Sequence, residues 1–188
     1  MLKRNVLFLL LAALPFAAHA GDTYTVDPLH TFAHFKISHL GFSTLHGRFD
    51  KTSGKITLDP KAKTGSMEIT METNSISTGY GKRDSDLESP DFFNAAEFPT
   101  MTYKATKFHF KGDKVASVDG ELTLLGVTRP VKLTVTDMHC GINPMHKKYE
   151  CGADAVAEVK RSEFGMKTYL PAIGDEVKLE FDIEAYKD

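Results

Sequence analysis

The feature that most constrains the fold is a regular alternation of apolar and polar residues. Residues 177–185 alternate without interruption, and residues 67–72 and 131–136 do the same. Successive side chains of a β-strand point to opposite faces, so each of these segments has one dry face and one wet face. Antiparallel sheets with one solvated side produce this pattern, and the chain is therefore expected to be all-β.

Less regular stretches extend the same pattern. Residues 81–89 break it, because they are charged and polar except for Leu87, and one short helix or ordered loop is predicted near 81–93. About eight to ten strands with this single interruption fit a sandwich or a closed barrel, and the pattern alone leaves both open. The further strands are predicted at residues 24–27, 31–39, 45–49, 55–59, 100–110 and 114–124, and around Ala153, Ala155, Ala157 and Val159, which share one face.

The N-terminus has the three parts of an export signal. Lys3 and Arg4 precede an apolar stretch at residues 6–14, and Ala18-His19-Ala20 fits a small-residue cleavage site. The apolar stretch is shorter than the roughly 20 residues that cross a bilayer. We therefore expect a cleaved signal peptide at residues 1–20 and a single mature domain at residues 21–188.

Charge and composition exclude several classes of protein. The chain has 23 lysines and arginines against 25 aspartates and glutamates, without a long basic run, so nucleic acid is not the expected partner. A hydrophobic content of 41% is too high for a disordered chain. No apolar stretch after the signal is long enough for a membrane-spanning helix.

The two cysteines fit export. Cys140 and Cys151 enclose ten residues that include turn formers such as Gly141 and Pro144. In an oxidising compartment such a pair is expected to form a disulfide across a long hairpin, which would contribute on the order of 3 kcal/mol. The alternative is a reactive pair, which the spacing does not favour because the sequence lacks a C-x-x-C motif.

The histidines do not predict a metal site. His30 and His34 lie on one face of a predicted strand, about 13 Å apart at the usual rise per residue, which is too far to share an ion. His39 and His46 flank a turn at Gly41 and could approach each other across it.

The charged residues do not predict catalysis. Arg83 and Asp84 are adjacent, which is more typical of an ion pair or of a contact at a helix start than of an acid–base pair. Arg161 and Glu163 are expected to pair across a strand edge. The sequence contains no hydrolase, metalloprotease or phosphate-loop motif, so no catalytic residue and no cofactor site is predicted.

A series of short motifs covers nearly all of the mature chain. Each motif is weak by itself, but together and in this order they closely resemble the YceI-like family of exported bacterial proteins. The longest block is the strongest of them. The motifs are Asp27-Pro28-Leu29-His30-Thr31, His39-Leu40-Gly41, Gly47-Arg48-Phe49, Arg83-Asp84, Ser89-Pro90-Asp91-Phe92-Phe93, Phe98-Pro99, residues 119–131 (DGELTLLGVTRPV) and residues 161–166 (RSEFGM).

The resemblance implies a single antiparallel, lipocalin-like barrel of about eight strands. It also implies a periplasmic binding or carrier protein, not an enzyme, whose apolar interior holds an isoprenoid lipid, either a polyprenyl chain or a quinone tail. Such a carrier would touch a membrane transiently, and its oligomeric state stays open. The family often has histidine where this chain has Asp86, so the local chemistry is expected to differ if this position contacts a lipid head group or caps the entrance.

Two other functions compete with the carrier. One is an exported enzyme that acts on an apolar substrate in the same cavity, and the other is a ligandless stress or interaction protein. The dry faces either enclose a cavity or pack together, with small Ala153, Ala155 and Ala157 leaving space opposite them in the first case. Phe92 and Phe93 with Leu87 either form an apolar lip or plug the barrel end.

The expected ligand-binding residues come from the dry faces and from the interrupting segment. They are Phe35, Ile37, Met67, Ile69, Met71, Leu87, Phe92, Phe93, Leu122, Leu124, Val131, Leu133, Val135, Leu179 and Phe181.

Overall fold

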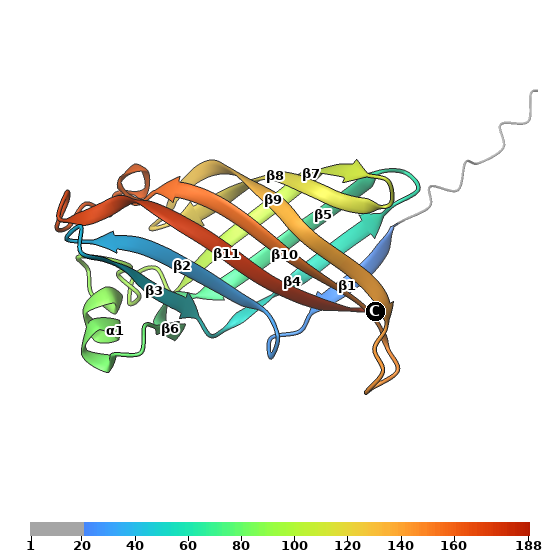
Figure 1. The fold of residues 1–188 in the computed structure, drawn as a ribbon, viewed down its shortest axis with the longest axis horizontal. Helices are drawn as coiled ribbons and strands as arrows, with labels where there is room; N and C mark the ends of the chain where they lie inside the picture. Colours follow the sequence, from blue (N-terminus) through green and yellow to red (C-terminus); the bar gives the residue numbers. More distant parts are fainter. Residues whose placement is uncertain (1–20) are drawn as a thin grey trace, which may run out of the picture.

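The structure, a computed structural model, describes residues 21–188, and the expected signal peptide lies outside this range. Figure 1 shows long, tilted strands with a small helix at one end. The strands are β1 (Asp22–Val26), β2 (Phe32–His39), β3 (Ser43–Phe49), β4 (Thr52–Asp59), β5 (Thr64–Glu72), β6 (Ile76–Ser77), β7 (Thr100–Lys111), β8 (Lys114–Leu124), β9 (Val127–Ile142), β10 (Tyr149–Lys160) and β11 (Ile173–Lys187); the helix is α1 (Gly81–Glu88), and 3₁₀ turns span Thr73–Ser75 and Arg161–Phe164.

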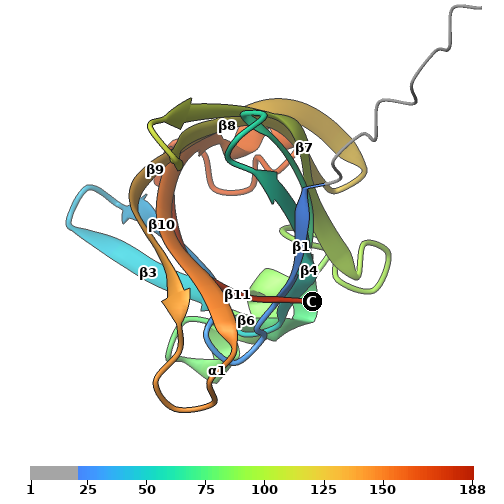
Figure 2. The ribbon, with the colours of Figure 1, turned by 90° about the vertical axis from the view of Figure 1, so that its right-hand side faces the viewer.

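The strands pair antiparallel and close into a ring. Within residues 21–188 the barrel has eight strands, in the order β1, β4, β5, β7, β8, β9, β10 and β11, and pairing of β1 with β11 completes it. Figure 2 looks along this ring. The expected all-β barrel is confirmed, and closure decides between the barrel and the sandwich.

β11 holds the ring together because one of its edges serves two strands. Residues 185–187 pair with residues 24–26 of β1, and residues 177–182 pair with residues 32–37 of β2. β2 then pairs with β3, and β3 pairs with β6 at Arg48 and Phe49. β2 and β3 therefore extend the wall beyond the closed ring, on the side where α1 lies (Figure 1).

The segment that breaks the alternation contains a short helix, which is one of the two alternatives that the sequence leaves open. α1 is fastened to the strand before it, because Asp84 accepts hydrogen bonds from the backbone N–H and hydroxyl of Thr78. Arg83 donates to the same residue at its hydroxyl and carbonyl oxygens, both at 2.8 Å. Among the described residues no helix has the length and apolar character needed to cross a bilayer.

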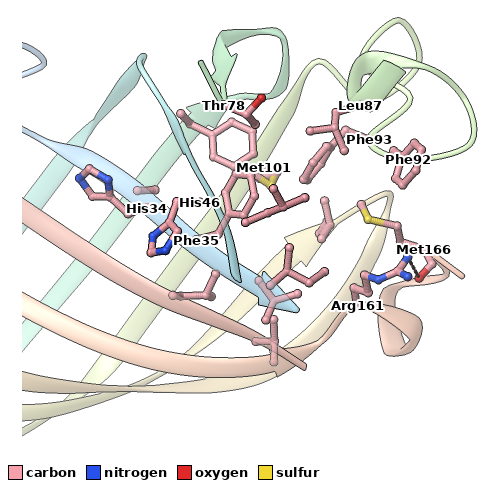
Figure 3. Close-up of a pocket in the computed structure, with 18 of the residues that line it drawn as sticks. His34, Phe35, His46, Thr78, Leu87, Phe92, Phe93, Met101, Arg161 and Met166 are labelled. Carbon is pink, nitrogen blue, oxygen red and sulfur yellow. Dashed lines mark hydrogen bonds between the residues drawn. The ribbon is translucent and has the colours of Figure 1, made fainter. Parts of the chain in front are cut away.

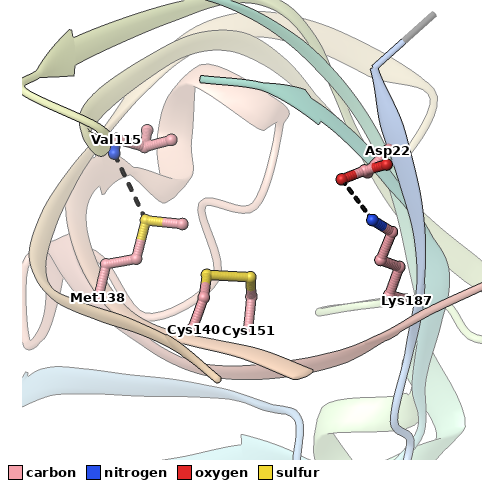
Figure 4. The surroundings of a disulfide bond; sticks show 6 residues. All are labelled: Asp22, Val115, Met138, Cys140, Cys151 and Lys187. Carbon is pink, nitrogen blue, oxygen red and sulfur yellow. Dashed lines mark hydrogen bonds and ion pairs between the residues drawn. A yellow bond between two sulfur atoms is a disulfide. The ribbon is translucent and has the colours of Figure 1, made fainter. Parts of the chain in front are cut away.

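The barrel end opposite α1 is closely packed. Tyr24, Ile56, Val118 and Ala185 are buried there. Cys140 and Cys151 face each other in the register of β9 and β10 and form the expected disulfide, which lies across the inside of the ring (Figure 4). The sulfur of Met138 beside it accepts a hydrogen bond from the backbone N–H of Val115.

The alanines of β10 do not open space as the sequence reasoning expects. Ala153 and Ala155 face this packed end, where they border a cavity of about 60 Å³. Bulky neighbours such as Phe108 and Met67 fill the room that the small side chains leave. Large residues on the opposite wall therefore compensate for the alanines.

Two glycines let aromatic rings lie flat against the inner wall. Gly120 of β8 lies under Tyr103 of β7, and a Cβ atom at Gly120 would come within 2.5 Å of the Tyr103 ring and hydroxyl. The Tyr103 hydroxyl donates to the carbonyl oxygen of Val131 at 2.8 Å, so this buried polar group is satisfied. Gly47 of β3 has the same relation to Phe35 of β2.

The close approach of Tyr103 to Gly120 predicts the effect of a single methyl group. Gly120→Ala should lower the free energy of unfolding by about 2 kcal/mol, because the ring must leave its place and its hydrogen bond. Urea unfolding followed by circular dichroism measures the change. Gly152→Ala is the matched control, since its Cβ would meet its nearest neighbour at 3.7 Å, an ordinary contact. Equal effects of the two substitutions would contradict the explanation.

Candidate functional site

A cavity of about 680 Å³ occupies the α1 end of the barrel. Its wall comes from the inward faces of β2, β8, β9 and β11, and its mouth is bordered by the segment 78–93 and the loop that precedes β11. Figure 3 shows Leu87 and Phe93 on one side of this end, with Arg161 and Met166 on the other. The interior is therefore packed at one end and hollow at the other.

Most of the residues expected to bind a ligand line this cavity. The exceptions are Met67, Ile69 and Val135, which border cavities of about 60 and 30 Å³ nearer the packed end. These three share the correct face of their strands, but they lie too far toward the packed end. Those that line the large cavity are Phe35, Ile37, Met71, Leu87, Phe92, Phe93, Leu122, Leu124, Val131, Leu133, Leu179 and Phe181.

The cavity also has lining residues that the sequence reasoning did not select. Met101 and Tyr103 alternate with polar residues in the predicted strand 100–110, so their inward direction could have been predicted. Leu45 and Phe49 of β3 carried a weaker signal, because the strand is short and Gly47 interrupts the apolar face between them. Met166 and Tyr169 come from an irregular loop, for which no periodicity exists.

The aromatic residues after α1 have different surroundings. Phe93 packs edge-to-face against Phe49 of β3, with ring centroids 5.3 Å apart. Phe92 lies beside Tyr169 of the opposite loop, with centroids 6.0 Å apart. Leu87 and both phenylalanines border the cavity and are half-buried, so this cluster narrows the mouth and leaves the cavity behind it unfilled.

A buried arginine organises the loop on the other side of the mouth. Arg161 retains only 3% of its exposed surface, and its guanidinium donates to the carbonyl oxygens of Met166, Thr168, Ile173 and Gly174 at 2.8–3.2 Å. The expected pairing of Arg161 with Glu163 is wrong. The carbonyl oxygens of the returning loop replace that carboxylate, because the chain turns back on itself directly after β10.

Two polar residues buried in the cavity wall, Tyr103 and Arg161, already have hydrogen-bond partners. Burial raises the pKa of Tyr103, whose hydroxyl is bonded to a backbone carbonyl. Burial also lowers the pKa of Arg161, although Asp175 opposes that shift, and an arginine so shifted remains charged. Neither group is free to attack, protonate or polarise a bound molecule.

The polar residues at the mouth lie on the exposed side of the cavity. Lys82 and Asp86 are exposed on α1, with 3.7 Å between the ammonium nitrogen and a carboxylate oxygen. Asp86, where the resemblance puts histidine, therefore lies at the entrance rather than in the apolar interior.

A closed antiparallel barrel with an apolar cavity at one end belongs to the class of small β-barrel proteins built to enclose a ligand. The YceI-like domain model matches residues 24–185, and the chain belongs to that family. UPF0312 protein PA0423 of Pseudomonas aeruginosa is 36% identical over 193 residues, with 100% of each chain covered.

Solved structures share the fold. BcnA of Burkholderia cenocepacia has a TM-score of 0.71 and 24% identity, covering 85% of this chain and 98% of that one. A polyisoprenoid binding domain from Saccharophagus degradans, implicated in plant cell wall breakdown, has a TM-score of 0.67 and 18% identity, covering 88% and 98%.

The loop at the mouth depends on an ionised carboxylate. Burial opposes ionisation of Asp175, but hydrogen bonds from the backbone N–H and hydroxyl of Ser162 outweigh it and hold the pKa below its usual value of 3.8. Since the pKa is lower in the folded state, the stabilisation is present above about pH 3.8 and is lost as the pH falls through the folded-state value.

Asp175→Asn should therefore reduce stability by about 1 to 2 kcal/mol at pH 7, because a hydrogen bond to a charged acceptor is replaced by a weaker one. The difference from the unsubstituted protein should disappear as the pH is lowered below 3.8. Urea unfolding at a series of pH values measures it. A difference that persists unchanged at the lowest pH would contradict this account.

Proposed function

We propose that this protein is a periplasmic carrier that holds an isoprenoid lipid, a polyprenyl chain or a quinone tail, in the cavity at the α1 end of the barrel. The observation that carries the proposal is the cavity itself, about 680 Å³ of space lined mainly by aliphatic, aromatic and methionine side chains. Methionines such as Met71, Met101 and Met166 adapt their shape to an irregular, flexible guest. The neighbour from Saccharophagus degradans that shares this fold is itself a polyisoprenoid binding domain.

The cavity volume sets how much of a lipid is enclosed. Pockets of about 300 to 1,000 Å³ hold molecules of the size of a drug, so this cavity accommodates a few isoprene units. The closely packed half of the barrel, beside the disulfide, blocks deeper entry. A longer chain must therefore fold back or leave part of its length at the mouth.

The energetics of transfer suit a reversible carrier. Burial of a CH₂ group contributes about 0.8 kcal/mol when the reference is water, and a long chain counted this way would exceed the roughly 20 kcal/mol that limits non-covalent binding. The lipid instead comes from a membrane, where its tail is already in an apolar environment. Net transfer into the barrel then gains little, and the lipid can be released again.

The mouth of the cavity carries exposed apolar side chains suited to membrane contact. Phe42 at the β2–β3 turn is 90% exposed, and Tyr169 in the loop before β11 is 66% exposed. Leu40 belongs to the same end, because its backbone N–H donates to the carbonyl oxygen of Ala172 at 2.8 Å. Large apolar groups placed together beside an apolar cavity would enter the bilayer surface and bring the mouth to its ligand.

The satisfied polar groups favour a carrier over an exported enzyme. Catalysis needs polar groups that converge on a reacting atom, whereas Tyr103 and Arg161 direct their donors to backbone carbonyls. The hollow interior favours a carrier or an enzyme over a ligandless stress or interaction protein. The carrier accounts for both observations.

Filling the cavity should remove the lipid without unfolding the protein. Leu179→Trp places an indole inside the cavity, and the amount of co-purifying lipid should fall at least tenfold, which corresponds to about 1.4 kcal/mol. Native mass spectrometry of protein from the periplasmic fraction, followed by lipid extraction, measures loading. Lys178→Trp puts the same ring on the outer face of the same strand and should leave loading unchanged, with Leu122→Phe as a second cavity-filling variant.

Three results would overturn the carrier proposal. The first is a protein that carries no prenyl lipid after gentle purification. The second is equal loading of the inner and outer tryptophan variants. The third is turnover of a lipid substrate by the purified protein, which would favour the enzyme.

Membrane contact at the mouth predicts a difference between two equally exposed side chains. Phe42→Ser should slow the uptake of a quinone from phosphatidylethanolamine–phosphatidylglycerol vesicles about tenfold, as expected when one large apolar side chain no longer inserts. Met145, 87% exposed in the hairpin between β9 and β10 at the other end, supplies the control. Met145→Ser should leave the rate unchanged, and equal slowing by both variants would contradict a specific docking face.

A further inference from the structure

A second hollow lies on the outer face of the barrel, away from the lipid cavity. It extends over β9, β10 and β11, which lie side by side in Figure 2, and has a volume of about 360 Å³. Its floor includes Gly152, which is paired with His139 on one side and Glu184 on the other. The missing side chain at this position creates the depression.

At one edge of this hollow, three side chains from two parts of the chain converge. Asp27 and His30 belong to the turn between β1 and β2, and Glu184 belongs to β11. One carboxylate oxygen of each acid and one ring nitrogen of His30 lie within 4.8 Å of one another. His30 Nδ1 lies 2.7 Å from Asp27 Oδ2 and 3.8 Å from Glu184 Oε2.

These separations are near those of a zinc coordination sphere. Zinc bonds of about 2.0 to 2.1 Å in tetrahedral geometry place ligand atoms about 3.3 Å apart. The two distances from His30 Nδ1, 2.7 and 3.8 Å, lie on either side of that value, and all three ligand atoms lie within 4.8 Å of one another. The His30 side chain is 60% exposed, so its ring can adjust, whereas Asp27 is held in place by the hydroxyl of Tyr186 at 2.7 Å and the backbone N–H of Leu29 at 2.9 Å.

Glu150 provides an independent indication of a missing partner. Its side chain is 11% exposed and lines the hollow beside Glu184. Its Oε2 accepts a hydrogen bond from the Asn143 amide and lies 3.7 Å from His146 Nε2, but its buried Oε1 receives no hydrogen bond from any residue of the described range 21–188. A buried carboxylate oxygen that faces another carboxylate calls for a positively charged partner.

The charge around the hollow also favours a cation. Asp154 lies opposite Asp137 on one neighbouring strand and opposite Asp182 on the other. Like charges placed directly across a sheet destabilise it unless something neutralises them. Within residues 21–188 the lining includes these aspartates, both glutamates and two histidines, but no lysine or arginine.

We propose that Asp27, His30 and Glu184 form a three-ligand zinc-binding site on the outer face of the barrel, with the carboxylate of Glu150 beside Glu184 adding negative charge next to the ion. A nitrogen ligand together with carboxylates suits zinc better than calcium or magnesium, which prefer oxygen ligands alone. A bound ion would join the β1–β2 turn to β11. The site is independent of the carrier function and does not require a lipid.

The test is a zinc titration of the untagged full mature protein after removal of metals with EDTA. Isothermal titration calorimetry should show about one equivalent of zinc per chain, and the melting temperature should rise with zinc. His30→Gln and Glu184→Gln each remove a ligand and should weaken binding at least tenfold. Glu150→Gln removes a charge beside the ligands and should weaken binding about tenfold.

A matched control comes from the far side of the barrel. His109 lies 2.7 Å from Asp119, but among the described residues no third metal-ligating side chain completes a cluster around this pair. His109→Gln should therefore leave zinc affinity unchanged. The proposal is wrong if the unsubstituted protein does not bind zinc, or if His109→Gln weakens binding as much as His30→Gln.

A crystal structure of the unsubstituted protein with zinc tests the site even if the variants fail to fold. Crystals of the unsubstituted protein grown with zinc should show an anomalous difference peak between His30 and Glu184. A peak at any other place on the surface, without one here, would overturn the assignment.

Discussion

Everything in this molecule depends on the two-strand pairing along one edge of β11. The end of that edge pairs with β1 and closes the ring, and the preceding part pairs with β2 and extends the wall beyond it. Closure satisfies the backbone groups that an open sheet edge would leave unpaired. It also fixes which faces of the strands meet inside, and this alignment makes a shared interior possible.

The interior divides into two parts because the inward side chains differ along the barrel axis. Near the disulfide, Tyr24, Ile56 and Phe108 border a space of only about 60 Å³. Toward α1 the large inward side chains lie along the barrel wall instead of pointing to its centre, since Tyr103 lies over Gly120 and Phe35 lies over Gly47. The hollow end therefore results from aromatic rings that lie along the wall, and not from the small residues of β10.

Much of the architecture could be predicted from the alternation alone. The strands of the barrel and the inward direction of Leu133 or Leu179 follow from period two, and the disulfide follows from export and spacing. The break in the pattern after Ser77 indicates a helix or an ordered loop, and the structure has the helix. How far along the axis the cavity extends could not be predicted, which is why Met67, Ile69 and Val135 fall outside it. Arg161 gave no signal either, because its partners are backbone carbonyls of an irregular loop.

The glycines under the rings and the convergence on Glu184 show a common limit of sequence reasoning. Gly47 and Phe35 lie on the two strands of one hairpin and meet only through its register, and Asp27 and Glu184 meet only when β1 closes on β11. Periodicity tells which face a residue takes, but register tells which residue lies opposite. Register depends on the complete topology of the sheet.

The way β3 is attached has a consequence for exchange of the guest. β3 is held to β2 along its length, but to β6 only through Arg48 and Phe49. Breaking those few backbone bonds would release only the outer edge of β3, because β2 stays paired with β11 and β1 stays paired with β11. The mouth of the cavity would thus widen for a bulky guest by displacement of β3 alone, while the closed ring of eight strands stays paired.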